Sequence, residues 1–193
     1  MTDKPIIFSA TMIRALLDGR KTQKRRVLKP QPFDVDSSGR WYRMPSGGLS
    51  LNCHDLPYAR GDRLWVQEPW ACHMDEWAYE YDPAHRGNKS PGLNWMFPSD
   101  MPHWASRLTL TVTDVRVQRV REISEADVYA EAAMDRPKGP RLGSDVTARD
   151  NARNAMAKLW NSINGPDAWD RNDWVAALTF DVHRCNIDQM GAP

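Results

Sequence analysis

The stretch Leu108-Thr109-Leu110-Thr111-Val112-Thr113-Asp114-Val115-Arg116-Val117 carries the strongest indication of fold in this chain. Leucine or valine occupies every second position up to Val112, which is typical of a strand with one buried face. Val115 and Val117 then continue in the opposite phase, so the alternation slips by one residue at Thr113-Asp114. Such a slip is typical of a β-bulge or a sharp bend. It predicts a bent strand of the kind that closes a small β-barrel.

Further strands and helices are predicted on both sides of this stretch. Residues 6–8, 62–70 and 174–182 have the composition and alternation of strands. Apolar residues at helical spacing follow the capping residues Ser9 and Ser124, and they recur over residues 152–163. We therefore expect an α+β fold, in which helices flank a small barrel.

Two long segments lack any periodic pattern. Residues 30–60 are rich in Pro, Gly, Ser and Asp, and residues 71–104 are aromatic and interrupted by Pro. We expect both segments to be loop insertions in a single domain over residues 1–185. Residues 186–193 are expected to form a flexible tail.

Composition sets limits on the function. The chain has 193 residues with 41% hydrophobic and 26% charged residues, which is typical of a globular protein with a sizeable core. The net charge of +1 excludes attraction of the whole molecule to nucleic acid, so any such contact must be local. The three cysteines are scattered, and no run approaches the roughly 20 apolar residues of a membrane span. We expect a cytoplasmic protein without membrane contact, and the oligomeric state is left open.

The most basic part of the chain is Asp18-Gly19-Arg20-Lys21-Thr22-Gln23-Lys24-Arg25-Arg26. It follows a predicted helix end, where cations are electrostatically favoured. In an extended chain Lys21, Gln23 and Arg25 share one face, whereas residues 20, 22, 24 and 26 share the other. Neighbouring cations lower the proton affinity of an amine, which prepares Lys21 to act as a base or nucleophile. Because the positive charge is concentrated in this turn, Lys21 and Arg26 are also the candidates to contact an anionic ligand. The alternative is a solvated basic edge that discourages aggregation.

Parts of this turn resemble a known family. Gly19, Lys21, Lys24 and Arg26 are similar to the G-x-K-x-x-[acid or Thr]-x-R signature of the ASCH domains. These domains are small barrels related to the PUA fold of RNA-binding modules. Residues 61–66, 102–107 and 123–131 resemble a subgroup that is common in phage and prophage genomes. The likeness covers most of the chain in scattered blocks.

The resemblance implies an activity. Bacterial members of the family hydrolyse N4-acetylcytidine with a Lys, a Thr and a Glu. Their positions fall on Lys21, Lys24 and Glu131, which are the catalytic candidates here. Lys24 cannot replace a threonine nucleophile, so deacylation would need a different route. A phage-encoded protein would act in the host cytoplasm.

Glu131 is also a candidate on its own pattern. It lies on the apolar side of its predicted helix, near Val128 and Met134. A desolvated carboxylate suits proton transfer unless a cation keeps it ionised, and Lys21 is the natural partner. The alternative is an ordinary helix glutamate that faces solvent or Arg136.

Ligand-binding candidates gather near the ends of predicted strands. Trp70, Trp95, Trp104 and Arg107 lie there, and a flat base could stack on Trp104 while Arg107 meets a phosphate or a base edge. Glu68 shares a strand face with apolar residues, so it could point inward and accept the exocyclic amine of a cytosine. Ser106 belongs to the same block. The alternative is that the tryptophans fill a small core.

Metal ligands are not predicted. Cys53-His54, Cys72-His73 and the pair His183 and Cys185 match no chelating spacing. No nucleotide-binding glycine loop and no Ser-His-Asp pattern is present. We expect neither a metal nor another cofactor.

Three functions use these residues. We expect the chain to bind RNA or a modified nucleoside in a pocket at the barrel mouth. Hydrolysis of an N4-acylcytidine would use Lys21 and Glu131, and a single-strand ribonuclease would use Lys21, Arg26 and Arg107. A reader of modified bases or RNA would need no catalysis. Whether the chain is an enzyme stays open at this point.

Overall fold

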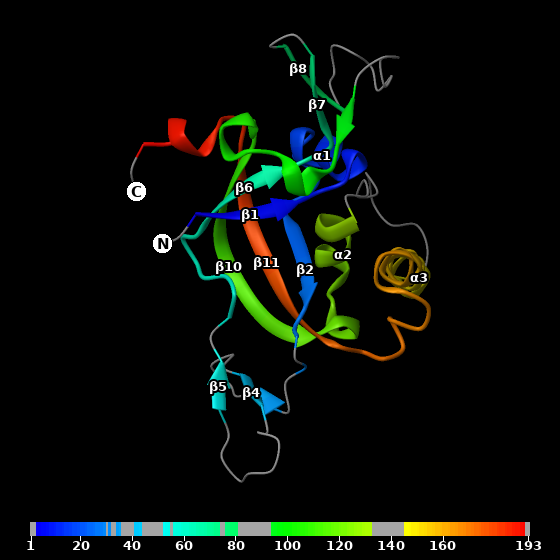
Figure 1. Cartoon of the computed structure of the whole chain (residues 1–193). Coiled ribbons are helices and arrows are strands. Elements are labelled where there is room, and N and C mark those ends of the chain that lie inside the picture. Colours follow the sequence, from blue (N-terminus) through cyan, green and yellow to red (C-terminus); the bar gives the residue numbers. More distant parts are fainter. Residues whose placement is uncertain are drawn as a thin grey trace. The chain divides into compact units, whose positions relative to one another are not determined.

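Figure 1 shows the computed structural model of the chain, an α+β fold of mixed sheets and α-helices. The described residues are 3–29, 31, 34–35, 41–43, 52–54, 56–73, 76–80, 94–132 and 145–191. The strands are β1 (Asp3–Ile7), β2 (Gln23–Val27), β3 (Asp34–Val35), β4 (Trp41–Arg43), β5 (Asn52–His54), β6 (Arg63–Gln67), β7 (Trp70–His73), β8 (Glu76–Tyr79), β9 (Trp95–Met96), β10 (Thr109–Arg119) and β11 (Trp174–His183). The α-helices are α1 (Ala10–Leu17), α2 (Glu125–Ala132) and α3 (Asp145–Asn164), and the 3₁₀ helices are η1 (Pro98–Asp100), η2 (His103–Ala105), η3 (Val120–Glu122) and η4 (Ile187–Gln189).

The largest sheet has the strand order β1-β6-β10-β11-β2. β1 is parallel to β6, with Ile6 opposite Val66, whereas β10 is antiparallel to β6 and β11 is antiparallel to β2. The pairings of the described residues leave this sheet open, so the closed barrel that the sequence predicts is not found among them. A phase slip bends a strand, but it does not supply the last pairing that closes a barrel.

β10 confirms the predicted change of phase. Leu110 and Val112 are buried, Asp114 is exposed, and beyond it Val115 and Val117 are less exposed than Arg116 between them. The strand continues through the slip without a break. β10 therefore turns one set of alternate residues inward before the slip and the other set inward after it.

The chain divides into two compact units at this slip. Unit 1 comprises residues 1–21, 60–113 and 180–193, and unit 2 comprises residues 22–59 and 114–179. β10 and β11 run through both units. The single domain over 1–185 stays a prediction, and each unit is described by itself below.

Unit 1 contains α1 and the start of the main sheet. Ser9 occupies the N-cap position in an extended conformation, but its side chain makes no capping hydrogen bond to the helix backbone. Ile13 and Leu16 are buried as their spacing predicts. The predicted strand over 62–70 is in fact two strands, because Pro69 lacks the N–H that a continuous ladder needs.

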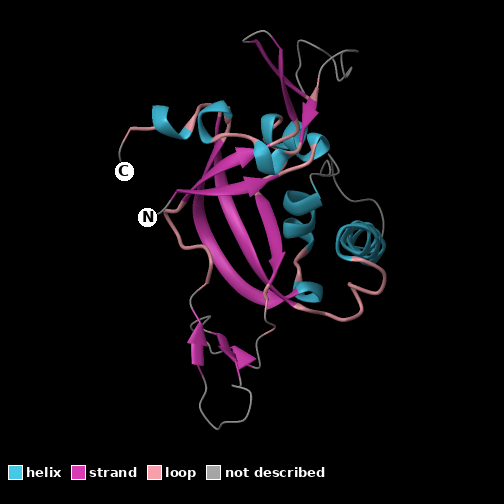
Figure 2. Ribbon diagram, in the orientation of Figure 1, coloured by secondary structure: helices cyan, strands magenta, loops and turns pink. Residues whose placement is uncertain are grey.

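Unit 2 has a core between α2, α3 and its part of the sheet. α2 contacts both α3 and β2, and Figure 2 shows α2 and α3 side by side. The core residues are Val120, Ile123, Val128, Tyr129, Ala152, Met156, Trp160, Ala168, Trp169 and Val175. Ile163 was expected on the buried face of α3, but it is 57% exposed. It lies in the last turn of the helix, just before the chain leaves at Gly165.

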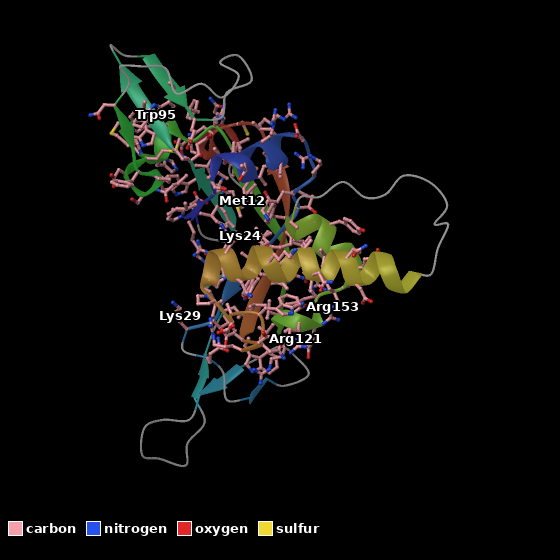
Figure 3. All side chains as sticks on the ribbon, turned by 90° about the vertical axis from the view of Figure 1, so that its right-hand side faces the viewer. Met12, Lys24, Lys29, Trp95, Arg121 and Arg153 are labelled. Carbon is pink, nitrogen blue, oxygen red and sulfur yellow. The ribbon has the colours of Figure 1, made fainter. Side chains whose placement is uncertain are left out.

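The predicted loop insertions contain short strands. β3, β4 and β5 form one sheet in the order β3-β4-β5, and β7, β8 and β9 form another in the order β8-β7-β9. Trp95 of β9 is labelled in Figure 3. Strands of two to four residues are too short to display an alternating pattern.

The end of the chain is more ordered than the flexible tail that the sequence predicts. η4 follows Asn186, whose side chain accepts a hydrogen bond from the backbone N–H of Asp188. Ile187 is buried. One apolar residue gives no period, so this turn could not be recognised from the sequence.

Candidate functional site

The basic turn alternates in burial as predicted. Lys21, Gln23 and Arg25 are buried, whereas Lys24 is half-buried and Arg26 is exposed. This is the two-faced pattern of an extended chain. A fully solvated basic edge is therefore wrong for the three buried residues.

Lys21 belongs to unit 1, and its amine lies near an aromatic ring of the same unit. The residue is 0% exposed, and its Nζ lies 5.9 Å from the centre of the Phe8 ring. The negative face of an aromatic ring stabilises a cation at this separation. The other two catalytic candidates, Lys24 and Glu131, belong to unit 2.

Glu131 lies beside an arginine that the sequence did not suggest. Its Oε2 is 3.4 Å from Nη1 of Arg25. The expected alternative partner Arg136 falls outside the described residues. Within unit 2, Arg25 is one cation that lies beside Glu131.

Arg25 belongs to a buried polar network between β2 and α2. Its Nη1 also donates to Oε1 of Gln23, and Nε2 of Gln23 donates to Oδ1 of Asp127 over 2.7 Å. Nη2 of Arg25 lies 3.4 Å from Oδ2 of Asp127. Burial lowers the pKa of Arg25 below its ordinary value, although the charges of Glu131 and Asp127 oppose the shift.

Asp127 is held in its ionised form. Burial by itself would raise its pKa, but hydrogen bonds from Gln23 and Ser124 and the charges of Arg116 and Arg25 outweigh it. The pKa of Asp127 is therefore lower than that of an ordinary aspartate. The network joins α2 to β2, and its members are already engaged with one another.

Arg26 lies on the opposite face of β2. Its guanidinium carbon is 5.7 Å from the centre of the Tyr58 ring. Arg26 thus retains the outward direction that a ligand contact requires, within unit 2 alone.

Five of the predicted ligand-binding residues belong to unit 1, namely Glu68, Trp70, Trp104, Ser106 and Arg107. Glu68 is 1% exposed, and both of its oxygens accept from Arg107, Oε1 from Nε and Oε2 from Nη2, each over 2.8 Å. The guanidinium of Arg107 also lies 4.1 Å from the centre of the Tyr79 ring. Glu68 points inward as expected. Its observed partner is the guanidinium of Arg107, whereas the predicted partner was the exocyclic amine of a bound cytosine. A bidentate pair against an aromatic ring fixes the plane of the guanidinium.

Ser106 and Trp70 support the fold. The Ser106 hydroxyl is within hydrogen-bonding distance of the Val66 and Leu108 carbonyls, at 2.8 and 3.0 Å. Trp70 is buried and packs with Met101 and Ala105. For these two residues the structure favours packing over ligand contact.

Trp104 is different, because its side chain is 55% exposed. Phe97, in the same connection between β9 and β10, is 76% exposed. We call residues 97–107 the aromatic segment. It combines two exposed rings with the fixed guanidinium of Arg107.

The backbone of the aromatic segment is held by Asn186. The Nδ2 of this residue is within hydrogen-bonding distance of the carbonyls of His103, Trp104 and Ser106, at 3.0, 3.2 and 2.7 Å. Asn186 was not among the predicted residues, since it lies 80 residues from Ser106 and shows no local signal.

Metal ligands are not gathered in the described ranges, where no group of three or more His, Cys, Asp or Glu residues could hold an ion. The side chains of Cys53, His54, Cys72 and His73 lie outside what the structure describes. In these ranges no helix is both long enough and apolar enough to cross a bilayer.

No protein-family model and no curated protein matches this chain. The crystal structure of hypothetical protein PH0355 is similar with a TM-score of 0.41 and 9% identity, over 95% of this chain and 100% of that one. The crystal structure of protein EF3133 from Enterococcus faecalis V583, of family DUF984, is similar with a TM-score of 0.44 and 13% identity, over 97% of this chain and 83% of that one. Likenesses of this size assign neither a family nor an activity.

Proposed function

We propose that this protein binds single-stranded RNA or a modified nucleoside through the aromatic segment of unit 1. The single observation that carries the proposal is the exposed Trp104 on a backbone that Asn186 holds in place. Exposed tryptophan on a fixed turn is the usual means by which proteins stack on unpaired bases.

The energetics support stacking. Asn186 already holds the backbone of the turn, so binding does not have to order it. A base laid on an aromatic side chain contributes about 1–3 kcal/mol. Phe97 offers a second ring in the same segment, with 76% of its surface exposed.

Arg107 supports recognition of a flat or anionic group. Its guanidinium is oriented by Glu68 and by the Tyr79 ring. The charge of Glu68 offsets that of Arg107, so the contribution of Arg107 is directional more than electrostatic. This suits a base edge or a single phosphate.

Hydrolysis of N4-acylcytidine is the enzymatic form of this proposal. Its candidates are Lys21 and Glu131, with Lys24 at the position of the family's threonine. Glu131 already lies beside Arg25 in the buried network, with its Oε2 3.4 Å from Nη1 of the arginine. Free cytidine released from an acylated nucleoside, and its loss in Lys21→Ala, would establish it.

The binding proposal is tested by fluorescence anisotropy with labelled single-stranded RNA and with a labelled N4-acetylcytidine. Trp104→Ala should weaken binding about 5- to 150-fold, which corresponds to about 1–3 kcal/mol of stacking. Ile163→Ala is the matched control, because Ile163 is exposed to a similar extent, 57% against 55%, and lies on α3. Equal affinities of wild type and Trp104→Ala would refute the assignment of the site.

A further inference from the structure

We propose that the modified nucleoside bound by the aromatic segment is one whose base carries a positive charge, as an adenine methylated at N1 or a guanine methylated at N7 does. This inference rests on the proposed function and narrows its ligand from modified bases in general to cationic ones. The residues that carry it are the exposed Trp104 and the carboxylates of Asp100 and Asp188.

The aromatic segment has an excess of negative charge. Its only Lys, Arg, Asp or Glu residues are Asp100 and Arg107, and residues 186–191, which include the side chain that holds its backbone, contain only Asp188. The positive charge of Arg107 is offset by Glu68, whose two oxygens each accept a hydrogen bond from it over 2.8 Å. The two aspartates are therefore left to set the local charge in this part of unit 1.

Asp100 lies on a fixed part of the aromatic segment. It ends η1, and Nε2 of the buried Gln67 donates to the carbonyls on either side of it, those of Ser99 and Met101, over 3.3 and 3.4 Å. The Asp100 side chain is exposed, and its Oδ1 accepts a hydrogen bond from the Ser99 hydroxyl. No lysine or arginine of the described ranges lies within ion-pairing distance of this carboxylate.

The backbones of Asp188 and Trp104 are joined by one side chain. Nδ2 of Asn186 donates to the Trp104 carbonyl over 3.2 Å, and its Oδ1 accepts from the backbone N–H of Asp188 over 2.9 Å. Ile187, between Asn186 and Asp188, is buried and anchors the turn. The second carboxylate is thus attached to backbone that is held against the stacking residue.

The cations closest to Asp188 do not remove its charge at neutral pH. Arg63 feels the charge of Asp188, but its guanidinium is bound to Asp3 through hydrogen bonds of 2.8 and 2.7 Å. Nδ1 of His103 lies 3.3 Å from Oδ2 of Asp188, and an imidazole offsets a carboxylate only when it is protonated. The Asp188 side chain is itself 66% exposed, so its charge is open to a ligand.

A cationic base gains more at such a site than a neutral one. Tryptophan is the aromatic side chain whose face attracts a cation most strongly, and this attraction adds to the stacking that any base makes. The carboxylates of Asp100 and Asp188 attract the same positive charge. A neutral modified base gains neither contribution.

The test compares two nucleosides with isomeric bases. 1-Methyladenosine is positively charged at pH 7.5, whereas N6-methyladenosine has the same ring system and one methyl group but is neutral. Dissociation constants are measured by isothermal titration calorimetry at pH 7.5, where imidazoles are mostly neutral. We expect 1-methyladenosine to bind about 2- to 30-fold more tightly, which is the range of cation–π attraction from exposed to desolvated sites.

The double variant Asp100→Asn with Asp188→Asn tests the two carboxylates, because it removes their charges and keeps the size of the side chains. We expect its preference for 1-methyladenosine to be about 2- to 4-fold smaller than that of wild type, with unchanged affinity for N6-methyladenosine. A merely structural effect would weaken the binding of both nucleosides equally. The matched control is Asp181→Asn, an exposed aspartate of unit 1 on β11, outside the aromatic segment and its supporting turn. It should keep the wild-type preference.

Each adverse result refutes a different step. Equal affinities for both nucleosides in wild type, or binding of labelled single-stranded RNA without binding of either nucleoside, refute the charge preference and leave the proposed function standing. A preference that the double variant retains in full refutes the role of the two carboxylates. Absence of binding to both nucleosides and to RNA refutes the proposed function, and the inference falls with it.

Discussion

Arg25 and Arg26 are the same residue type in adjacent positions, yet they have opposite surroundings. The Arg25 side chain is fully buried among Gln23, Asp127 and Glu131, whereas Arg26 points outward. We expect Arg25→Ala to lower the free energy of unfolding by about 3–5 kcal/mol, because it leaves two carboxylates without their buried cation. Urea denaturation of the variant and wild type measures this difference.

Arg26→Ala is the matched control for Arg25→Ala. An exposed substitution of this kind changes stability by no more than about 0.5 kcal/mol. Equal losses in both variants would show that the network between β2 and α2 contributes little. The double variant Arg25→Ala with Glu131→Ala should recover part of the loss, since one of the unpaired charges is then removed.

At the scale of elements, the end of α1 depends on Gly19. Its φ is +69°, a left-handed conformation, and a Cβ added there would meet nothing within 4 Å. Gly19→Ala should therefore destabilise by about 1–2 kcal/mol through backbone conformation alone. Thermal unfolding measures the loss.

Gly191→Ala provides the comparison for Gly19→Ala. It also has open space around the added Cβ, but its φ is not in the left-handed range. Its unfolding temperature should match that of wild type. A comparable loss in both variants would mean that the conformation at Gly19 does not limit stability.

Long periodic elements could be predicted from the sequence, whereas short or interrupted ones could not. The phase slip in β10 and the helix α1 follow from apolar spacing alone. Pro69 divides a predicted strand into β6 and β7, and the strands inside residues 30–60 and 71–104 are too short for any period. These misses share one cause, which is that the pairing partner decides where a short strand forms.

Single residues of the candidate site could be selected from the sequence, whereas contacts between two distant residues could not. Trp104 and Arg107 were selected because they lie near strand ends, and both are accessible at least in part. The pairing of Arg25 with Glu131 spans 106 residues, and that of Asn186 with Ser106 spans 80. Partners this far apart leave no trace in local spacing, so the network around Arg25 and the role of Asn186 required the structure.

For the whole molecule, a net charge of +1 gives no general attraction to nucleic acid, so the response of binding to salt depends on how many phosphates are neutralised locally. A protein that neutralises six to ten phosphates loses about 10³- to 10⁵-fold in affinity between roughly 50 and 200 mM salt. If stacking on Trp104 dominates and Arg107 meets about one phosphate, the loss over that range should be only about threefold. Anisotropy titrations across the salt range measure the slope.

A steep salt dependence would contradict that expectation. It would indicate that several basic residues contact the backbone of the nucleic acid together, which the aromatic segment does not provide. Arg107→Ala should flatten the slope further, and Arg26→Ala should leave it unchanged.

The passage of β10 from one unit to the other has a consequence for dividing the protein. A chain cut between Thr113 and Asp114 would end each fragment in the middle of a strand and expose backbone groups that invite aggregation. Because each unit is built from separate stretches of the chain, no single cut of the sequence separates one unit from the other.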